Sequence, residues 1–205
     1  MMYTRILFLL LLCWSARVNA QQEETLLSKA KVHGGFGGPI FTYAKVKGNN
    51  GFGSGGGGAV LINNLFVGGF GQGETFDIGL SGNQDYRMNL GYGGIWLGYV
   101  FPTQRLLHFY GSLKLGAGGI NYDERRLDPD VFDGLDDAVF VATPEVGAEL
   151  NLTHWFRLAG TIGYRVVDGF RGAPDLGTNA LNAPVYGLTL RFGWFGHKAW
   201  GKSGR

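Results

Sequence analysis

The sequence is almost without cysteine. Its one cysteine, Cys13, lies in an N-terminal segment that we predict is removed on export. The rest of the chain therefore cannot form a disulfide, and thiol catalysis and thiolate metal sites are excluded.

A hydrophobic run long enough to cross a membrane as a helix is also missing. The longest apolar stretch, residues 6–14, falls short of the about 20 residues that a spanning helix needs. Arg5 precedes it, and Val18-Asn19-Ala20 follows with short side chains where a signal peptidase would cut. We predict a signal peptide over residues 1–20. The bulky neighbours of Cys13 argue against the alternative of a lipoprotein.

A surplus of basic charge is absent once this segment is removed. The whole chain has 18 Lys and Arg against 16 Asp and Glu, and removal of Arg5 and Arg17 leaves 16 against 16. No Lys/Arg cluster remains, which excludes a nucleic-acid partner.

Glycine, by contrast, is abundant. The 37 glycines are spread through the apolar stretches and are not gathered in a linker. Each glycine costs a helix about 1 kcal/mol relative to alanine, whereas barrels use glycine for bends and close packing. Scattered glycine therefore favours an all-β fold. No linker or long-period repeat divides the chain, which indicates one domain.

Eight stretches of strand length follow the predicted leader. We predict strands at 32–47, 52–62, 65–78, 87–101, 108–122, 138–150, 156–167 and 184–195. Short connections (63–64, 102–107, 151–155) alternate with long ones (79–86, 123–137, 168–183), and 48–51 is the exception. This alternation is typical of an eight-stranded antiparallel up-and-down transmembrane β-barrel whose two termini lie on the periplasmic side.

Alternation with a period of two is clearest in the last three strands. The predicted lipid-facing side carries Phe140, Ala142, Val146, Leu150, Phe156, Leu158, Ile162, Tyr164, Val166, Tyr186, Leu188, Leu190, Phe192 and Trp194. The predicted lumenal side carries Thr143, Glu145, Gly147, Glu149, Arg157, Thr161, Gly163, Arg165, Gly187, Thr189, Arg191 and Gly193.

A soluble β-sandwich would show the same alternation. Aromatic residues favour the membrane barrel, because they gather near strand ends, where a membrane has its two interfaces. The predicted band near the short turns holds Phe101, Phe109, Trp155, Phe156, Trp194 and Phe195, and the band near the long loops holds Tyr43, Phe76, Tyr122, Phe140 and Tyr164.

Three segments carry a resemblance to known barrels: residues 91–101 (GYGGIWLGYVF), 108–119 (HFYGSLKLGAGG) and 144–158 (PEVGAELNLTHWFRL). In them the chain resembles small OmpA/OmpX-type outer-membrane barrels, and still more the short outer-membrane barrel proteins of Bacteroidota-type bacteria. The resemblance implies fold and location. The chain departs from it in the ten residues that follow the aromatic last strand. We expect a periplasmic segment at 21–31, the barrel at 32–195 and a periplasmic tail at 196–205.

The lumen of an eight-stranded barrel is wide enough only for side chains, so we expect inward charges to meet one another. The candidates are Lys114, Glu145, Glu149, Arg157, Arg165 and Arg191. A three-residue turn at 152–154 would place residues whose numbers sum to 306 opposite each other, which pairs Glu149 with Arg157. The alternative is ion conduction along these charges.

The remaining motifs give only weak evidence for a catalytic, cofactor or metal site. His108, Tyr110 and Ser112 share a face, and barrels that modify lipid A use His and Ser, but residues i and i+4 of a strand lie about 13 Å apart. The stretch Gly53 to Gly58 matches the dinucleotide fingerprint without the helix that this motif needs. The acidic loop 123–137 could bind Ca²⁺, although its spacing fails the Ca²⁺-loop pattern. The remaining histidines, His33, His154 and His197, lack metal-ligand spacing.

These observations predict a non-enzymatic structural or interaction component of a Gram-negative outer membrane, without a cofactor. Its expected partners are outer-membrane lipid, lipopolysaccharide and, during insertion, the barrel-assembly machinery; the sequence identifies no protein partner. The alternatives are a narrow porin or transport accessory and a lipid-A-modifying enzyme.

Overall fold

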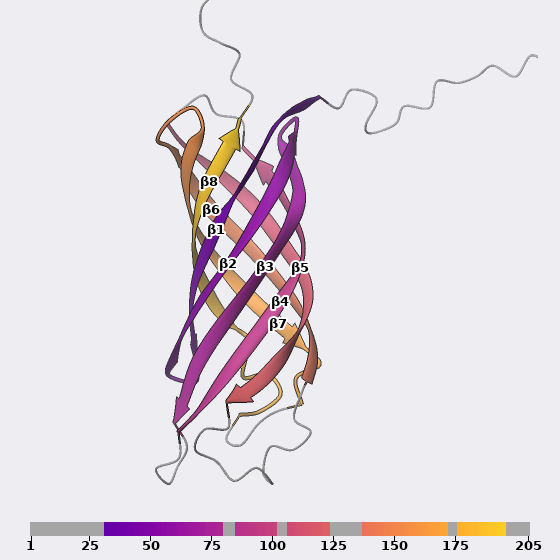
Figure 1. Ribbon diagram of the computed structural model, residues 1–205, viewed down its shortest axis with the longest axis vertical. Coiled ribbons are helices and arrows are strands. Elements are labelled where there is room, and N and C mark those ends of the chain that lie inside the picture. Colours follow the sequence, from indigo (N-terminus) through magenta and orange to yellow (C-terminus); the bar gives the residue numbers. More distant parts are fainter. Residues whose placement is uncertain (1–30, 80–84, 102–105, 124–136, 172–175, 196–205) are drawn as a thin grey trace, which may run out of the picture. The chain divides into compact units, whose positions relative to one another are not determined.

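The computed structural model describes residues 31–79, 85–101, 106–123, 137–171 and 176–195. Eight antiparallel strands pair in chain order and close into a barrel, with β8 against β1 (Figure 1). The strands are β1 (Val32–Val46), β2 (Asn49–Ile62), β3 (Leu65–Gly79), β4 (Asp85–Val100), β5 (Leu107–Asp123), β6 (Asp137–Asn151), β7 (Phe156–Asp168) and β8 (Ala183–Trp194). The predicted fold class and strand number are confirmed.

The β1–β2 connection is shorter than expected. The sequence suggested a connection at 48–51, but the turn is formed by Lys47 and Gly48, whose φ angles are 45° and 90°. Two residues with positive φ form a tight hairpin turn whose twist matches that of the strands. Asn49, Asn50 and Gly51 therefore belong to β2.

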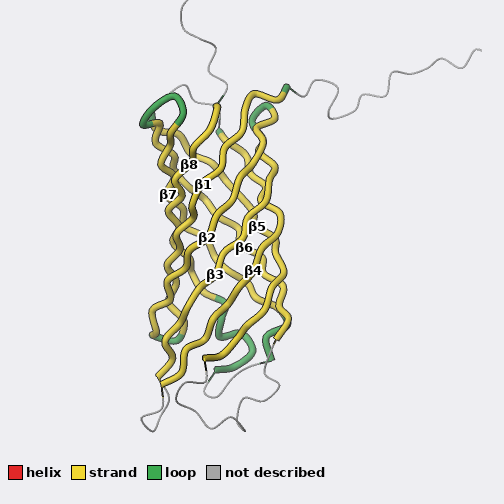
Figure 2. The backbone as a smooth tube through the Cα atoms, in the orientation of Figure 1, coloured by secondary structure: helices red, strands yellow, loops and turns green. Residues whose placement is uncertain are grey.

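Apart from the tight β1–β2 turn, which lies at the opposite end, the short turns lie at the end of the barrel where β1 begins and β8 ends (Figure 1). In the β6–β7 turn, the Thr153 hydroxyl accepts the backbone N–H groups of Trp155 and Phe156, at 3.3 and 3.0 Å. Strands form nearly all of the described wall, and turns or loops occur at its two ends (Figure 2). No helix in the described residues is long and apolar enough to cross a membrane.

The register of β6 and β7 corrects one prediction. Glu149 lies opposite Ala159, and Arg157 lies opposite Asn151, so that paired residue numbers sum to 308 and not to 306. The last pair before the turn is Asn151 with Arg157, so the connection is two residues longer, on the β7 side, than the three-residue turn assumed. Within it, the Leu152 and Thr153 N–H groups both donate to the Phe156 carbonyl.

The predicted faces of the last three strands are confirmed. Val146, Ile162 and Trp194 are 69%, 58% and 69% exposed on the outer surface, whereas Glu149, Arg165 and Arg191 are buried inside. A barrel with apolar side chains outside and charges inside suits a hydrocarbon surrounding, because its closed wall pairs the backbone groups.

Three of the predicted band aromatics point inward. Phe76 and Phe195 are buried in the lumen, and Tyr122 is partly buried against the same core. Large aromatics remain outside at both ends, notably Phe101, Phe109, Trp155 and Trp194 near the short turns and Phe140 and Tyr164 near the long loops. Phe76 points into the interior because it lies an even number of residues from inward-facing Glu74 on β3. Phe195 does so because it lies an even number of residues from inward-facing Arg191 on β8.

Candidate functional site

The lumen gathers the polar side chains of the barrel into three clusters. Each cluster is built around one buried glutamate: Glu149, Glu145 or Glu74. Apolar and aromatic side chains fill the space between them. All six predicted charges, Lys114, Glu145, Glu149, Arg157, Arg165 and Arg191, face this interior and are buried there.

The Glu149 cluster lies nearest the short turns. Glu149 Oε1 accepts a hydrogen bond from Arg157 Nη1 at 2.6 Å and lies 2.9 Å from His108 Nε2. The other carboxylate oxygen, Oε2, accepts a hydrogen bond from Arg191 Nη1. The predicted Glu149–Arg157 contact is therefore present as a diagonal pair, although the two residues are not directly opposite. One carboxylate serves two guanidinium groups, so the cluster carries a surplus of positive charge.

Aromatic rings surround the Arg191 guanidinium. Its central carbon lies 4.5 Å from the centroid of Phe36, 4.3 Å from Tyr110, 5.2 Å from Trp96 and 5.3 Å from Phe66. A desolvated cation over aromatic faces gains about 2 kcal/mol or more. The rings thus stabilise the cation that Glu149 neutralises only in part.

The Glu145 cluster joins β5 to β6. Lys114 Nζ donates to Glu145 Oε1 at 2.9 Å, and the Ser112 hydroxyl donates to Oε2 at 3.0 Å. The Lys114 ammonium also lies 5.2 Å from the Trp96 ring centroid and 5.8 Å from that of Phe70.

The Glu74 cluster lies toward the long loops. Glu74 pairs with Arg165, and its Oε1 accepts hydrogen bonds from Thr42, Gln72 and Tyr92 at 3.1–3.3 Å. Arg165 Nε also donates to the Leu181 carbonyl at 3.1 Å. Sequence reasoning missed Glu74, Gln72 and Tyr92. The sequence held one signal for them. Gln72 and Glu74 lie on the same face of β3 as Phe66 and Phe70, and Tyr92 lies on the same face of β4 as Trp96.

Side chains close the lumen at both ends. At the short-turn end, the Phe195 ring lies 3.6 Å from the Arg157 guanidinium carbon and stacks on Phe36. At the other end, Phe170, Leu176 and Leu181 from the β7–β8 loop are buried in the common core. The described interior is thus filled from the Phe195 level to the Leu181 level.

His108 and Ser112, the residues considered for a lipid-A-modifying enzyme, do not bond each other in the structure. His108 bonds Glu149, whereas Ser112 bonds Glu145, and both side chains are buried. Among the described residues, no group of three His, Cys, Asp or Glu side chains could hold a metal ion. Gly53 to Gly58 lies within β2, without the helix of a dinucleotide site. Loop residues 124–136, His197 and both termini lie outside the described residues.

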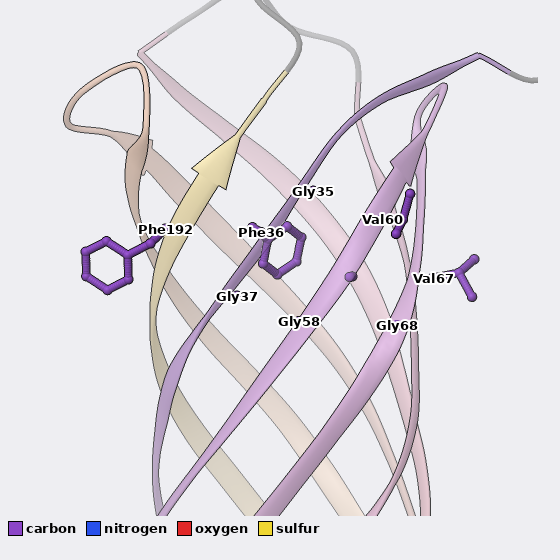
Figure 3. A pocket seen from close by; sticks show the side chains of 9 residues that line it. Gly35, Phe36, Gly37, Gly58, Val60, Val67, Gly68 and Phe192 are labelled. Atoms are coloured by element: carbon purple, nitrogen blue, oxygen red, sulfur yellow. The ribbon is translucent and has the colours of Figure 1, made fainter.

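A hollow lies on the outer wall, apart from the lumen. It is lined by Gly35, Phe36, Gly37, Gly58, Ala59, Val60, Val67, Gly68 and Phe192. Figure 3 shows Phe192 and Val67 projecting from the wall on either side of the strands that carry these glycines. Its floor is therefore largely backbone.

Comparisons with known proteins agree with this geometry. A family model described as an outer membrane protein beta-barrel domain matches residues 6–192. The solved structure of Neisserial surface protein A superposes with a TM-score of 0.52 at 13% identity, covering 81% of this chain and 98% of that chain. Ail, the attachment invasion locus protein of Yersinia pestis, solved with the heparin analogue sucrose octasulfate, gives a TM-score of 0.51 at 15% identity, covering 80% and 100%. No curated protein matches the chain. At these identities the two structures show the fold alone.

Proposed function

The chain belongs to the family of outer membrane protein beta-barrel domains, and we propose that it is a non-conducting, non-enzymatic structural or interaction component of that membrane. The family places it in the outer membrane of a Gram-negative bacterium. There we expect it to contact lipid and lipopolysaccharide. The observation that carries the proposal is the filled lumen.

The charged side chains inside the barrel are paired with one another. Glu74, Glu145 and Glu149 each bond at least one lumenal cation, and rings cover Arg191 and Lys114. An ion crossing the barrel would have to displace these pairs, and breaking a buried pair costs about 3–5 kcal/mol. This packing supports a structural role over the narrow porin or transport accessory.

The outward surface of the protein would then be its long-loop end. We assign contact with the surroundings to loops 79–86, 123–137 and 168–183, parts of which lie outside the described residues. The exposed aromatic residues Phe192 and Trp194 of the last strand suit recognition by the barrel-assembly machinery during insertion. Residues 1–20 would direct export, with 21–31 and 196–205 left in the periplasm.

Conductance measurement tests the sealed lumen. The purified protein, inserted in a planar lipid bilayer beside a general porin as positive control, should give no unitary current steps. Regular steps that scale with protein concentration would support the porin alternative.

Mass spectrometry of lipid A from cells with and without the protein tests the enzyme alternative. We expect identical spectra, and a missing or added acyl chain would contradict the proposal.

A further inference from the structure

The lumenal charges are divided between two parts of the wall. The three arginines, Arg157, Arg165 and Arg191, all lie on the β7–β8 hairpin. The glutamates that they pair with lie elsewhere: Glu74 is on β3 and Glu149 is on β6. Each of these arginine–glutamate pairs therefore joins the hairpin to the rest of the barrel.

The two ladders beside this hairpin are interrupted. Between β6 and β7, pairing stops at Ala142↔Val166 and resumes at Glu145↔Gly163, an interval that contains Pro144. Between β1 and β8, pairing stops at Gly37↔Phe192 and resumes at Ile40↔Thr189, an interval that contains Pro39. Proline has no N–H to donate to a ladder.

Apart from a register shift between Val32 and Gly34 at the start of β1, the ladders elsewhere in the described wall are continuous. The pairs of β2 with β3, β3 with β4, β4 with β5 and β5 with β6 follow one another without such an interval in the described residues. Water cannot replace a missing ladder bond in hydrocarbon. The hairpin is therefore the section of the wall with the weakest backbone attachment.

An arginine lies at each interruption. By the register of the flanking pairs, Arg165 falls opposite Thr143 beside Pro144, and Arg191 falls opposite Gly38 beside Pro39. Arg165 reaches Glu74 on β3, and Arg191 reaches Glu149 on β6. Both contacts cross the lumen to strands that are not hydrogen-bonded neighbours of the arginine's own strand.

We propose that the β7–β8 hairpin is a charge-latched section of the wall, docked by its arginines on Glu74 and Glu149 and able to detach as a unit. The arginine–glutamate pairs hold the hairpin in place where the β6–β7 and β1–β8 ladders are interrupted. Neutralising the carboxylates releases the hairpin before the other strands separate. This device is independent of whether the barrel conducts.

Amide hydrogen exchange of the mature protein in lipid nanodiscs tests the latch. Glu74→Gln and Glu149→Gln keep side-chain size but remove the charge, and each should accelerate exchange in β7 and β8 at least tenfold relative to β2–β4. Glu145→Gln is the matched control, because it breaks a buried pair with Lys114 that does not involve the hairpin. It should not accelerate β7 and β8 selectively.

A second pair of variants covers the case in which a glutamate variant does not fold. Pro39→Val and Pro144→Val restore the missing donors, and exchange in β7 and β8 should slow relative to β2–β4. The latch is refuted if the glutamate variants accelerate all strands alike or none, if Glu145→Gln releases the hairpin equally, or if the proline variants leave the hairpin unchanged.

Discussion

At the scale of the residue, Glu149 is the lumenal carboxylate that bonds two arginines. It bonds Arg157, Arg191 and His108 together, so removing one partner leaves it two others. Removing the carboxylate charge instead leaves two buried guanidinium groups without their anion. The two kinds of substitution should therefore differ in cost.

We predict that Arg157→Met lowers the free energy of unfolding by less than the about 3–5 kcal/mol typical of a broken buried pair. Glu149→Gln should cost more than Arg157→Met, because a buried cation without a counter-charge is costly. Urea unfolding in lipid vesicles, followed by tryptophan fluorescence, measures both. An unchanged midpoint for Arg157→Met, or a smaller effect for Glu149→Gln, would argue against this account of the cluster.

Two glycines on opposite faces offer a second residue-scale prediction. A Cβ on inward-facing Gly118 would overlap the Gly91 carbonyl oxygen and lie 2.6 Å from the Tyr92 Cα, whereas a Cβ on outward-facing Gly71 would meet nothing within 4 Å. Gly118→Ala should therefore destabilise the barrel by about 1–3 kcal/mol, and Gly71→Ala should be near neutral. The same unfolding assay compares them, and equal effects would mean that the interior tolerates the added volume.

At the scale of the element, the β1–β2 turn places a lysine in a left-handed conformation. Lys47 has a φ of 45° and is followed by Gly48, whereas Asn-Gly is the preferred pair for such a turn. We predict that Lys47→Asn stabilises the hairpin by up to about 1 kcal/mol, since a left-handed residue costs most side chains about 1–2 kcal/mol. A higher urea midpoint is the expected result; a lower one would show that the lysine side chain contributes more than its backbone costs.

The sequence predicted the later strands better than the earlier ones. β6, β7 and β8 carry large apolar residues outside and polar residues inside, so period-two alternation identified both faces. In β3 the large side chains Phe66, Phe70 and Phe76 point inward, and glycines occupy much of the outer face. Hydrophobicity alone would assign those faces the wrong way round.

Long-range partners explain the rest of the difference. Glu74 and Arg165 are 91 residues apart in the chain and lie on strands that are not neighbours, so no local pattern links them. The Glu149–Arg157 contact was predictable because one short turn joins its two strands, even though the assumed register was wrong by two residues.

At the scale of the whole molecule, the closed ring of paired strands predicts a barrel that resists detergent until heated. Strand pairs close the wall without a free edge, so unfolding must break many backbone hydrogen bonds together. The mature protein should require detergent for solubility and should migrate differently on a gel before and after boiling. Identical migration, together with solubility in plain buffer, would indicate a soluble sheet protein.

The direction of the side chains is the claim on which the account depends, and site-directed spin labelling tests it most directly. With Cys13 removed along with the predicted leader, single cysteines can be placed at consecutive positions of β8 from Tyr186 to Phe192. In lipid bilayers, labels at Tyr186, Leu188, Leu190 and Phe192 should collide freely with oxygen, and labels at Gly187, Thr189 and Arg191 should be shielded from it. The opposite phase, or no alternation at all, would contradict a barrel with its apolar face toward lipid and its charges inside.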